Sequence, residues 1–540
     1  MSERKPALTF LILFLLGAAG TPVADRALQA PRAAGAAQLA GRVTDGAGAG
    51  LPGVFVTARL SGRPVAVTAV TDATGRYELP GLPAGEHRLT AHAPGWIPAE
   101  ASVNAGRGAG ETMFTLERGG AVLGDVASAS FLGLLPDGED KRRFILDCTG
   151  CHLFDERVAL PDGLPRSRDS WVEAVGRMLQ FAGANSGFPV IGAERDPGAT
   201  ADFLTRHIQA GRGAPVLPAP APADPATAGS VITEYDIPVP TDLPHDLAIL
   251  PDGRIAITGM FTHRMYVLDP DAGAFDTIPI PVGNANPRAV EIDDNGDWWV
   301  LLGSPQAVAR YRPAARAWDR WPIGMYPHSI GIGRGRVWFN GHFTRDPELI
   351  GSLDTATGAV ERFQAPTHPR AAITGPIPYE LRVAPDGRVW VSELAGNRIL
   401  AFDAPSAAFR VFDMPASHSG PRRLDIARDG SVWIPEYAGN RLTRLDPASG
   451  RFESFDLPVP DAAPYVVRVD LRTGIVWIGT GAADAILAFE PASRRFTTFR
   501  LPTRGAMVRH MAVDPRNGDV WAAYGASPGT ATKVGRLRRG

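Results

Sequence analysis

Residues 378–421 read PYELRVAPDGRVWVSELAGNRILAFDAPSAAFRVFDMPASHSGP and contain one period of a repeat that fills the C-terminal part of the chain. Four short apolar runs alternate with turns made of Gly, Pro, Asp and Asn. The periods begin at Pro244, Pro287, Pro327, Pro378, Pro421, Pro464 and Val508, which are 43, 40, 51, 43, 43 and 44 residues apart. Four strands in a period of about 43 residues is the pattern of a β-propeller blade. The sequence therefore predicts a seven-bladed propeller over residues 231–540.

The repeat region begins with one extra strand, and its last period ends one strand short. Ile232-Thr-Glu-Tyr-Asp-Ile237 matches the fourth strand of a blade, and the last period ends with Lys533-Val-Gly-Arg-Leu537, which matches a third strand. Closing the ring removes the exposed edges of the sheets. We therefore predict that these two segments pair with each other.

With Asn397-Arg-Ile and Asn440-Arg-Leu as typical blade residues, residues 231–540 resemble the virginiamycin B lyase (streptogramin lyase) family. The lyases of that family carry histidines at the start of the first strand of the last two blades. A Glu two residues before the second histidine and another Glu ending the next strand complete a site around magnesium. The corresponding residues here are Tyr465, Arg509, Met507 and Gly525. The resemblance thus implies the fold, whereas lyase activity is disfavoured.

One mouth of the predicted channel is rich in polar side chains, because the starts of first strands and the loops between second and third strands converge there. The repeat alignment places at this mouth His245, Arg288, His328, Tyr379, Arg422, Tyr465 and Arg509, with Asn340, His342, Glu393 and Glu436. Such a ring indicates a ligand site, and its arginines favour a small anionic or polyoxygenated substrate. A divalent metal on His328, His342 and Glu393 is an alternative. The plainer interpretation is that water fills a polar mouth.

The only two cysteines of the 540 residues lie in Cys148-Thr-Gly-Cys151-His152, the C-x-x-C-H pattern of covalent c-type haem attachment. The two thiols bind the vinyl groups of one haem, and the histidine is the proximal iron ligand. A disulfide would leave His152 unexplained. Zinc needs four ligands, and there is no second cysteine pair. A thioredoxin-like motif needs a preceding strand, whereas residues 140–148 read as a helix. One covalent haem c is the prediction.

Residues 125–213 are predicted to form an α-helical domain around this motif, with further helical patterns over residues 167–178 and 199–208. The layout resembles a small class I cytochrome c. The resemblance implies a distal iron ligand from the middle or C-terminal part of the domain. Met178, the only methionine there, is the candidate, with His207 or an open site as alternatives. A closed site favours electron transfer, and an open one permits chemistry at the iron.

The N-terminus carries an export signal, since Arg4 and Lys5 precede the apolar run over residues 8–19 and small residues follow. This run is short for a permanent membrane span. We expect residues 1–24 to be a cleaved signal peptide, with an uncleaved anchor as the alternative. Export agrees with haem c, so the predicted compartment is periplasmic or otherwise exported. A net charge of −2 does not favour a nucleic-acid partner.

Residues 38–118 alternate apolar and polar residues between Gly, Pro and Asp turns, as in Leu51-Pro-Gly-Val-Phe-Val-Thr-Ala-Arg59. Period-2 patterning with frequent turns predicts a β-sandwich of about seven short strands. The segment resembles the carboxypeptidase regulatory-like family over its full length, which implies a non-catalytic module. Residues 214–230 form a Pro/Ala-rich linker, predicted to be an extended, semi-rigid spacer.

The sequence as a whole predicts a mainly β, multidomain chain. Its function is predicted to be haem-mediated electron transfer to a periplasmic redox partner, coupled to oxidation of a small substrate at the propeller mouth. One alternative is a binding scaffold, made of propeller and sandwich, that localises an electron-transfer cytochrome. The other alternative is a propeller lyase with an auxiliary cytochrome.

Overall fold

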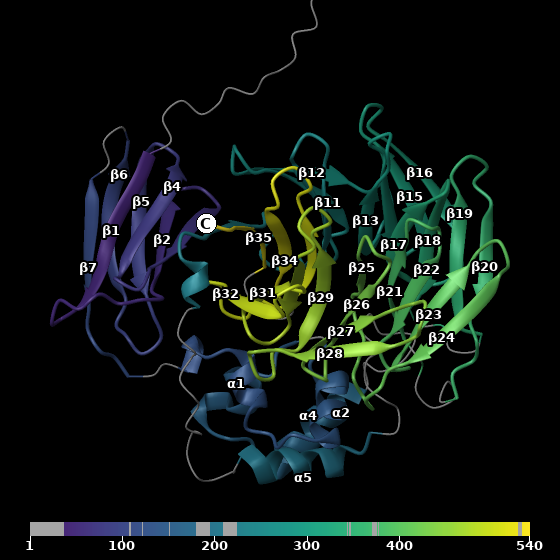
Figure 1. Cartoon of the computed structure of the whole chain (residues 1–540), viewed down its shortest axis with the longest axis horizontal. Helices are drawn as coiled ribbons and strands as arrows, with labels where there is room; N and C mark the ends of the chain where they lie inside the picture. Colours follow the sequence, from purple (N-terminus) through teal and green to yellow (C-terminus); the bar gives the residue numbers. More distant parts are fainter. Residues whose placement is uncertain are drawn as a thin grey trace, which may run out of the picture.

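The computed structural model of the protein describes residues 37–106, 110–120, 123–150, 152–179, 195–208, 224–342, 344, 347–369, 375, 377–526 and 532–540. The predicted signal peptide, Cys151 and most of the linker lie outside these residues. The described chain is mainly β and contains a sandwich, a group of helices and a propeller (Figure 1). No helix in these ranges is long and apolar enough to cross a membrane.

The N-terminal sandwich consists of two sheets with strand orders β4-β1-β7 and β3-β2-β5-β6. Its strands are β1 (Ala37–Asp45), β2 (Phe55–Leu60), β3 (Val65–Val70), β4 (Arg76–Leu82), β5 (Gly85–His92), β6 (Ala99–Ala105) and β7 (Glu111–Leu116). The alternating apolar residues point inward, and Leu39, Val43, Leu79 and Leu89 are at most 1% exposed. The predicted sandwich is confirmed.

The described propeller has seven four-stranded blades, as predicted; six are separate sheets, and the seventh is part of an eight-stranded sheet. From the channel outward, blades 1 to 3 are β9 (Pro244–Ile249), β10 (Ile255–Gly259), β11 (Arg264–Asp269), β12 (Ala274–Pro279); β13 (Pro287–Ile292), β14 (Trp298–Leu302), β15 (Ala307–Arg312), β16 (Ala317–Pro322); β17 (Pro327–Gly333), β18 (Arg336–Gly341), β19 (Leu349–Asp354), β20 (Val360–Gln364). Blades 4 to 6 are β21 (Pro378–Val383), β22 (Val389–Glu393), β23 (Arg398–Asp403), β24 (Ala408–Asp413); β25 (Asp425–Ile426), β26 (Val432–Glu436), β27 (Arg441–Leu445), β28 (Phe452–Asp456); β29 (Pro464–Val469), β30 (Val476–Thr480), β31 (Ala485–Glu490), β32 (Arg495–Arg500).

Blade 7 combines both ends of the repeat region and confirms the predicted ring closure. It consists of β33 (Val508–Val513), β34 (Val520–Tyr524), β35 (Lys533–Arg538) and β8 (Val231–Asp236). β35 and β8 are antiparallel, with Lys533 opposite Asp236 and Arg538 opposite Val231. The outer edge of β8 also pairs with β3 of the sandwich, from Val65 opposite Tyr235 to Ala69 opposite Val231. One sheet therefore runs from the channel through blade 7 into the sandwich.

The repeated aromatic residues fill the spaces within and between blades. Trp390 of β22 stacks on Phe412 of β24, with ring centroids 5.7 Å apart. Trp433 and Phe455 repeat this arrangement one blade further on. The conserved spacing in the repeat thus places a tryptophan in the second strand and an aromatic residue in the fourth strand on the same face of the blade.

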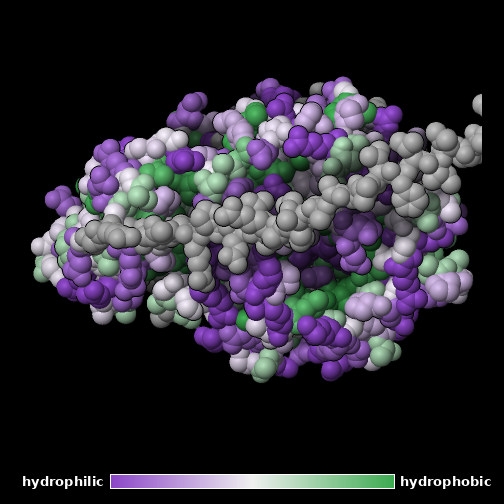
Figure 2. All heavy atoms as spheres, turned by 90° about the horizontal axis from the view of Figure 1, so that it is seen from above, coloured by the Kyte–Doolittle hydropathy of each residue, from purple (hydrophilic) through white to green (hydrophobic). Residues whose placement is uncertain are grey.

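The described part of residues 123–208 is mainly helical. It contains α1 (Ser128–Leu132), α2 (Glu139–Cys148), α3 (Glu156–Ala159), α4 (Arg168–Leu179) and α5 (Pro197–Ile208), with short 3₁₀ turns η1 (Leu123–Asp125) and η2 (Pro161–Gly163), while η3 (Pro225–Thr227) precedes β8. Phe144, Phe154, Trp171, Leu204 and Ile208 are buried in one apolar cluster, which continues into the propeller. The helices lie against one face of the propeller, below it in Figure 1. Seen from the opposite side, the described surface is mostly hydrophilic (Figure 2).

Candidate functional site

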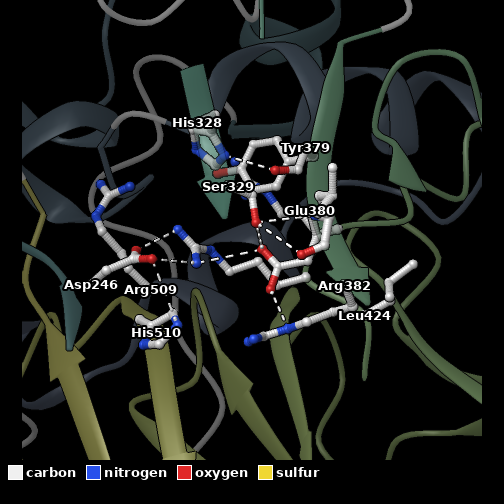
Figure 3. A network of polar contacts seen from close by, with 12 residues as sticks. Asp246, His328, Ser329, Tyr379, Glu380, Arg382, Leu424, Arg509 and His510 are labelled. Atoms are coloured by element: carbon white, nitrogen blue, oxygen red, sulfur yellow. Dashed lines mark hydrogen bonds and ion pairs between the residues drawn. The ribbon is translucent and has the colours of Figure 1, made fainter. Parts of the chain in front are cut away.

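A β-bulge after the opening proline shapes the channel wall. In blade 4 the pairing of β21 with β22 shifts register between Pro378 and Leu381, and blades 2, 3, 6 and 7 shift at the same point. A bulge adds one residue to a strand and re-aims its side chains. Consecutive residues such as Tyr379 and Glu380 thereby both reach the buried centre of the ring (Figure 3).

Eight of the residues predicted for the channel mouth lie together, and we refer to them with Tyr437 as the mouth cluster. The cluster contains His245, Arg288, His328, His342, Tyr379, Arg422, Tyr437, Tyr465 and Arg509, all of them at most 4% exposed. The ring of His328 stacks on His342 with centroids 4.2 Å apart, and its centroid is 5.3 Å from that of His245. The structure therefore brings these side chains together at one end of the channel.

Arg422 is surrounded by three tyrosine rings. Its guanidinium carbon lies 4.7 Å from the ring centroid of Tyr379, 4.0 Å from that of Tyr437 and 3.9 Å from that of Tyr465. The hydroxyls of Tyr379 and Tyr465 are hydrogen-bonded to each other. Arg509 donates from Nη1 to the Tyr465 hydroxyl at 3.2 Å. Cation–π contacts of this kind are strengthened by the absence of water.

The histidines of the cluster are neutral at pH 7. Burial, with a contribution from Arg288, lowers the pKa of His245 to about 3. The pKa of His328 falls well below its ordinary value because of burial and the neighbouring His342 and Arg288. Nδ1 of His328 donates to the carbonyl of Tyr379 at 2.7 Å, and Nδ1 of His342 donates to that of Pro378 at 3.0 Å. These bonds fix each ring and leave Nε2 as an acceptor.

Tyr465 is the acidic member of the tyrosine pair. Burial raises the pKa of its hydroxyl, but the guanidinium groups of Arg422, Arg509 and Arg423 lower the pKa by more, to about 8. The pKa of its partner Tyr379 is raised, chiefly by burial. A proton at this contact therefore resides on Tyr379 when Tyr465 ionises.

Beneath the mouth cluster, an ion-pair network fills the channel (Figure 3). Arg423 pairs with Asp246 at 2.7 Å and with Glu380 at 3.5 Å. Arg468 pairs with the other oxygen of Glu380 at 3.1 Å and donates to Nε2 of His510 at 2.9 Å. The network balances buried charges by close opposite charges, as interiors require.

The far opening of the channel, away from the helices, holds a cavity of about 300 Å³. Its charged lining consists of Glu291, Arg382, Asp425 and Arg468, with His510. Arg382 pairs with Glu291 at 2.9 Å and with Glu380 at 3.2 Å. These charges largely neutralise one another, so this opening has less unpaired positive charge than the mouth cluster.

Two predicted acidic members of the mouth are engaged elsewhere. Glu393 pairs with Arg398 of its own blade, and Glu436 pairs with Arg441 at 2.7 Å. Asn340 connects two blades, because its Oδ1 accepts from the amide of Ser329 and its Nδ2 donates to the Pro378 carbonyl. In the part of the chain that the structure describes, no group of three or more His, Cys, Asp or Glu side chains is arranged to hold a metal ion. Of the three residues in the metal alternative, His328 and His342 stack on each other, whereas Glu393 pairs with Arg398.

The helices cover the mouth cluster. The Tyr437 hydroxyl donates to the carbonyl of Thr149 at 2.8 Å and lies 2.9 Å from its Oγ1. Lys141, only 4% exposed, pairs with Asp461 at 2.7 Å. The amide of Ala129 donates to the carbonyl of Ala482 at 2.8 Å. Thr149, within the predicted haem motif, therefore lies directly over the mouth.

Two of the predicted haem-binding residues, Cys148 and His152, lie at the end of α2 and shortly after it. Cys148 is the last residue of α2 and is half-buried, while Cys151 lies outside the described residues. Nδ1 of His152 donates to the carbonyl of Leu153 at 3.1 Å. Met178 is half-buried in the last turn of α4, and His207 packs edge-on against Phe203 at the end of α5.

Comparisons with known proteins agree with two parts of this architecture. Residues 370–539 match the Virginiamycin B lyase family, and residues 38–117 match the Carboxypeptidase regulatory-like domain. The last four blades are thus similar to the Virginiamycin B lyase family. No curated protein matches the chain.

Among solved structures, the chain is similar to a streptogramin B lyase with a TM-score of 0.52 and 19% identity, over 58% of this chain and 99% of that one. It is similar to virginiamycin B lyase from Staphylococcus aureus with a TM-score of 0.50 and 20% identity, over 57% and 99% of the two chains. At these identities the likeness shows the fold.

Sequence reasoning did not identify Tyr437 or the network below the mouth. Tyr437 follows Glu436 at the end of a second strand, where the repeat alignment drew attention to the glutamate instead. The network residues occupy the second and fourth positions after the opening proline, as in Arg423 and Asp425 after Pro421. At the fourth position of three successive blades, Arg382, Asp425 and Arg468 alternate in charge, and this was the available signal.

Proposed function

We propose that this chain is an exported c-type haem protein that transfers electrons, with haem attached to Cys148 and Cys151 and with the propeller mouth as the site where a small substrate binds. A haem c supplies reversible one-electron transfer when it is bound. The proposal includes a periplasmic location and a periplasmic redox partner.

The observation that carries the proposal is the position of the motif. Thr149 lies between the two cysteines, and both its carbonyl and its hydroxyl meet the hydroxyl of Tyr437. Tyr437 in turn packs on Arg422 in the centre of the mouth cluster. A redox group at the motif would therefore lie close to anything that the mouth cluster binds.

The surroundings of the motif suit a haem. The bond from Nδ1 of His152 to the Leu153 carbonyl orients the ring and leaves Nε2 as the metal-binding nitrogen, which is the usual support for a metal-bound histidine. Phe144, Phe154 and Trp171 supply a buried apolar wall, and such walls exclude water from a redox site. Met178, which is half-buried on α4, is our candidate for the distal ligand.

The lyase alternative receives less support than electron transfer. The residues at the positions of the lyase histidines are Tyr465 and Arg509, and both are engaged in the buried contacts of the mouth cluster. The scaffold alternative shares the haem with our proposal and differs only in having no substrate at the mouth.

The test begins with the full chain exported from cells that carry haem-maturation machinery. We expect a covalently bound haem with a c-type reduced spectrum, absent from a Cys148→Ala/Cys151→Ala variant. Met178→Ala should abolish the methionine–iron charge-transfer band, and Met113→Ala, which changes an exposed methionine of the sandwich, should leave it intact. A folded wild-type chain without covalent haem would refute the proposal. A substrate that reduces the haem in the wild type but not in Arg422→Gln would separate it from the scaffold alternative.

A further inference from the structure

Two neighbouring arginines of blade 5 are equally buried, but only one of them is paired with acidic side chains. Arg422 and Arg423 are each 1% exposed. Arg423 pairs with the carboxylates of Asp246 and Glu380. Among the described residues, Arg422 pairs with no acidic side chain, and its Nε and Nη1 atoms have no hydrogen-bond partner. Burying a charge without a counter-charge is costly. The surroundings of Arg422 therefore lack a group that carries the opposite charge.

Arg288 has the same deficit on the opposite side of the mouth cluster. It is 2% exposed, its Nε has no hydrogen-bond partner, and no acidic side chain of the described chain pairs with it. Its Nη1 meets only the sulfur of Met260, at 3.2 Å. Both arginines contribute to lowering the pKa of His342, of which burial is the main cause. Two buried guanidinium groups of the mouth cluster therefore have nitrogen atoms without a hydrogen-bond partner.

The neighbours of Arg422 leave it suited to one class of ligand. Tyrosine rings cover the faces of the guanidinium, so only its edge N–H groups remain to bind a ligand. A guanidinium edge matches the two oxygens of a carboxylate, with parallel charge-assisted hydrogen bonds. The neutral histidines nearby add polar atoms without adding charge that would repel either partner.

We propose that Arg422 and Arg288 bind the carboxylate of an organic anion in the mouth cluster, beneath the Cys148–His152 motif. This carboxylate has two sources, a free small carboxylate or a carboxylate of the haem itself, and only the second source rests on the proposed function. In either case the ligand supplies the missing counter-charge. The helices close over it through Thr149 and Tyr437.

The test measures how sodium propionate, against sodium chloride at equal ionic strength, stabilises the full-length chain to thermal unfolding. It is carried out on the haem-loaded chain and on a haem-free Cys148→Ser/Cys151→Ser chain. Stabilisation of both forms identifies a free carboxylate as the ligand. Stabilisation of the haem-free form alone identifies the carboxylate of the haem. In the responding form, Arg422→Gln and Arg288→Gln should each weaken propionate binding by at least about tenfold.

Arg382→Gln is the matched control, because Arg382 is a channel arginine that already pairs with Glu291 and Glu380. It should lower stability but preserve the propionate response. If Arg422→Gln does not fold, Arg422→Lys, which keeps the charge but loses the planar fork, should still weaken the response. In the haem-loaded chain, Arg422→Gln should also lower the reduction potential, since a nearby positive charge favours the reduced haem.

Two results would overturn the inference: no propionate response in either form, or the same response in Arg422→Gln as in the wild type. The absorbance of the same samples reports covalent haem independently. Failure of haem attachment therefore refutes the proposed function, while the propionate response still decides whether the carboxylate site exists.

Discussion

Replacing Tyr437 with Phe should loosen the helices from the propeller. The change removes one hydroxyl, which donates to the Thr149 carbonyl at 2.8 Å, but keeps the ring that packs 4.0 Å from Arg422. Thr149 Oγ1 keeps its own bond to the Ile145 carbonyl at 2.8 Å. The main loss is therefore a donor to one buried carbonyl, which costs about 1–3 kcal/mol.

Native-state hydrogen exchange checks this prediction. Amides in the last turn of α2 should exchange about 5- to 150-fold faster, which is the same range of 1–3 kcal/mol expressed as an equilibrium constant. Tyr465→Phe is the matched control, since the Tyr465 hydroxyl contacts Tyr379 and Arg509 within the propeller. Equal exchange at α2 in the two variants would refute the reasoning that Tyr437 holds the helices in place.

Three further predictions concern buried charges. Lys141→Met should destabilise the chain by about 3 kcal/mol, because Asp461 loses its buried partner. A double-mutant cycle with Asp461→Asn in urea should show coupling, and additive effects would contradict the contact. Burial raises the pKa of Asp484 to about 6, above its value in the unfolded chain. The contribution of the protonated Asp484 to stability is therefore full below about pH 4 and is lost as pH rises through 6. Asp484→Asn should flatten the pH dependence of urea unfolding in this window by up to about 3 kcal/mol, and an unchanged pH profile would contradict the prediction. The pKa of Tyr465 is about 8, below its value in the unfolded chain, so ionisation of this residue should add stability as pH rises from 8 to 10. Ultraviolet difference titration should show one tyrosine ionising near pH 8, and Arg509→Gln should raise the pKa of that tyrosine. Tyrosine titration only above pH 10 would contradict the prediction.

The repeat pattern was sufficient to predict the propeller because its signals are local. The opening proline, the tryptophan of the second strand and the Gly or Asn turns recur within each period, and they determine strand number and order. The pairing of β8 with β35 was predictable for a related reason: the last period lacks its fourth strand, and the segment before the first period supplies one. The period-2 pattern of residues 38–118 predicted the sandwich in the same way.

The composition of the mouth was predictable only in part. Residues such as Arg422 follow the opening proline directly, so the alignment places them correctly. Glu393 and Glu436 also align at this end of their blades, but each has an arginine five residues later, Arg398 and Arg441, that pairs with it across a hairpin. The contact between Thr149 and Tyr437 joins residues 288 positions apart. No local pattern encodes such a contact.

The pairing of β3 with β8 has a consequence for how the ring is assembled. The strand that seals a propeller is ordinarily anchored on one side only, by the strand that is synthesised last. Here the sandwich leaves the ribosome before any blade and presents β3 as a template along which β8 can align. The seam is then half-built while the other blades are still emerging, and β35 arrives at an edge that is already in register. If the finished ring opened at this seam, β8 would stay paired with β3 of the sandwich. The pairing lost would be the one between β35 and β8, and β35 could pair again with a β8 that is still held in place.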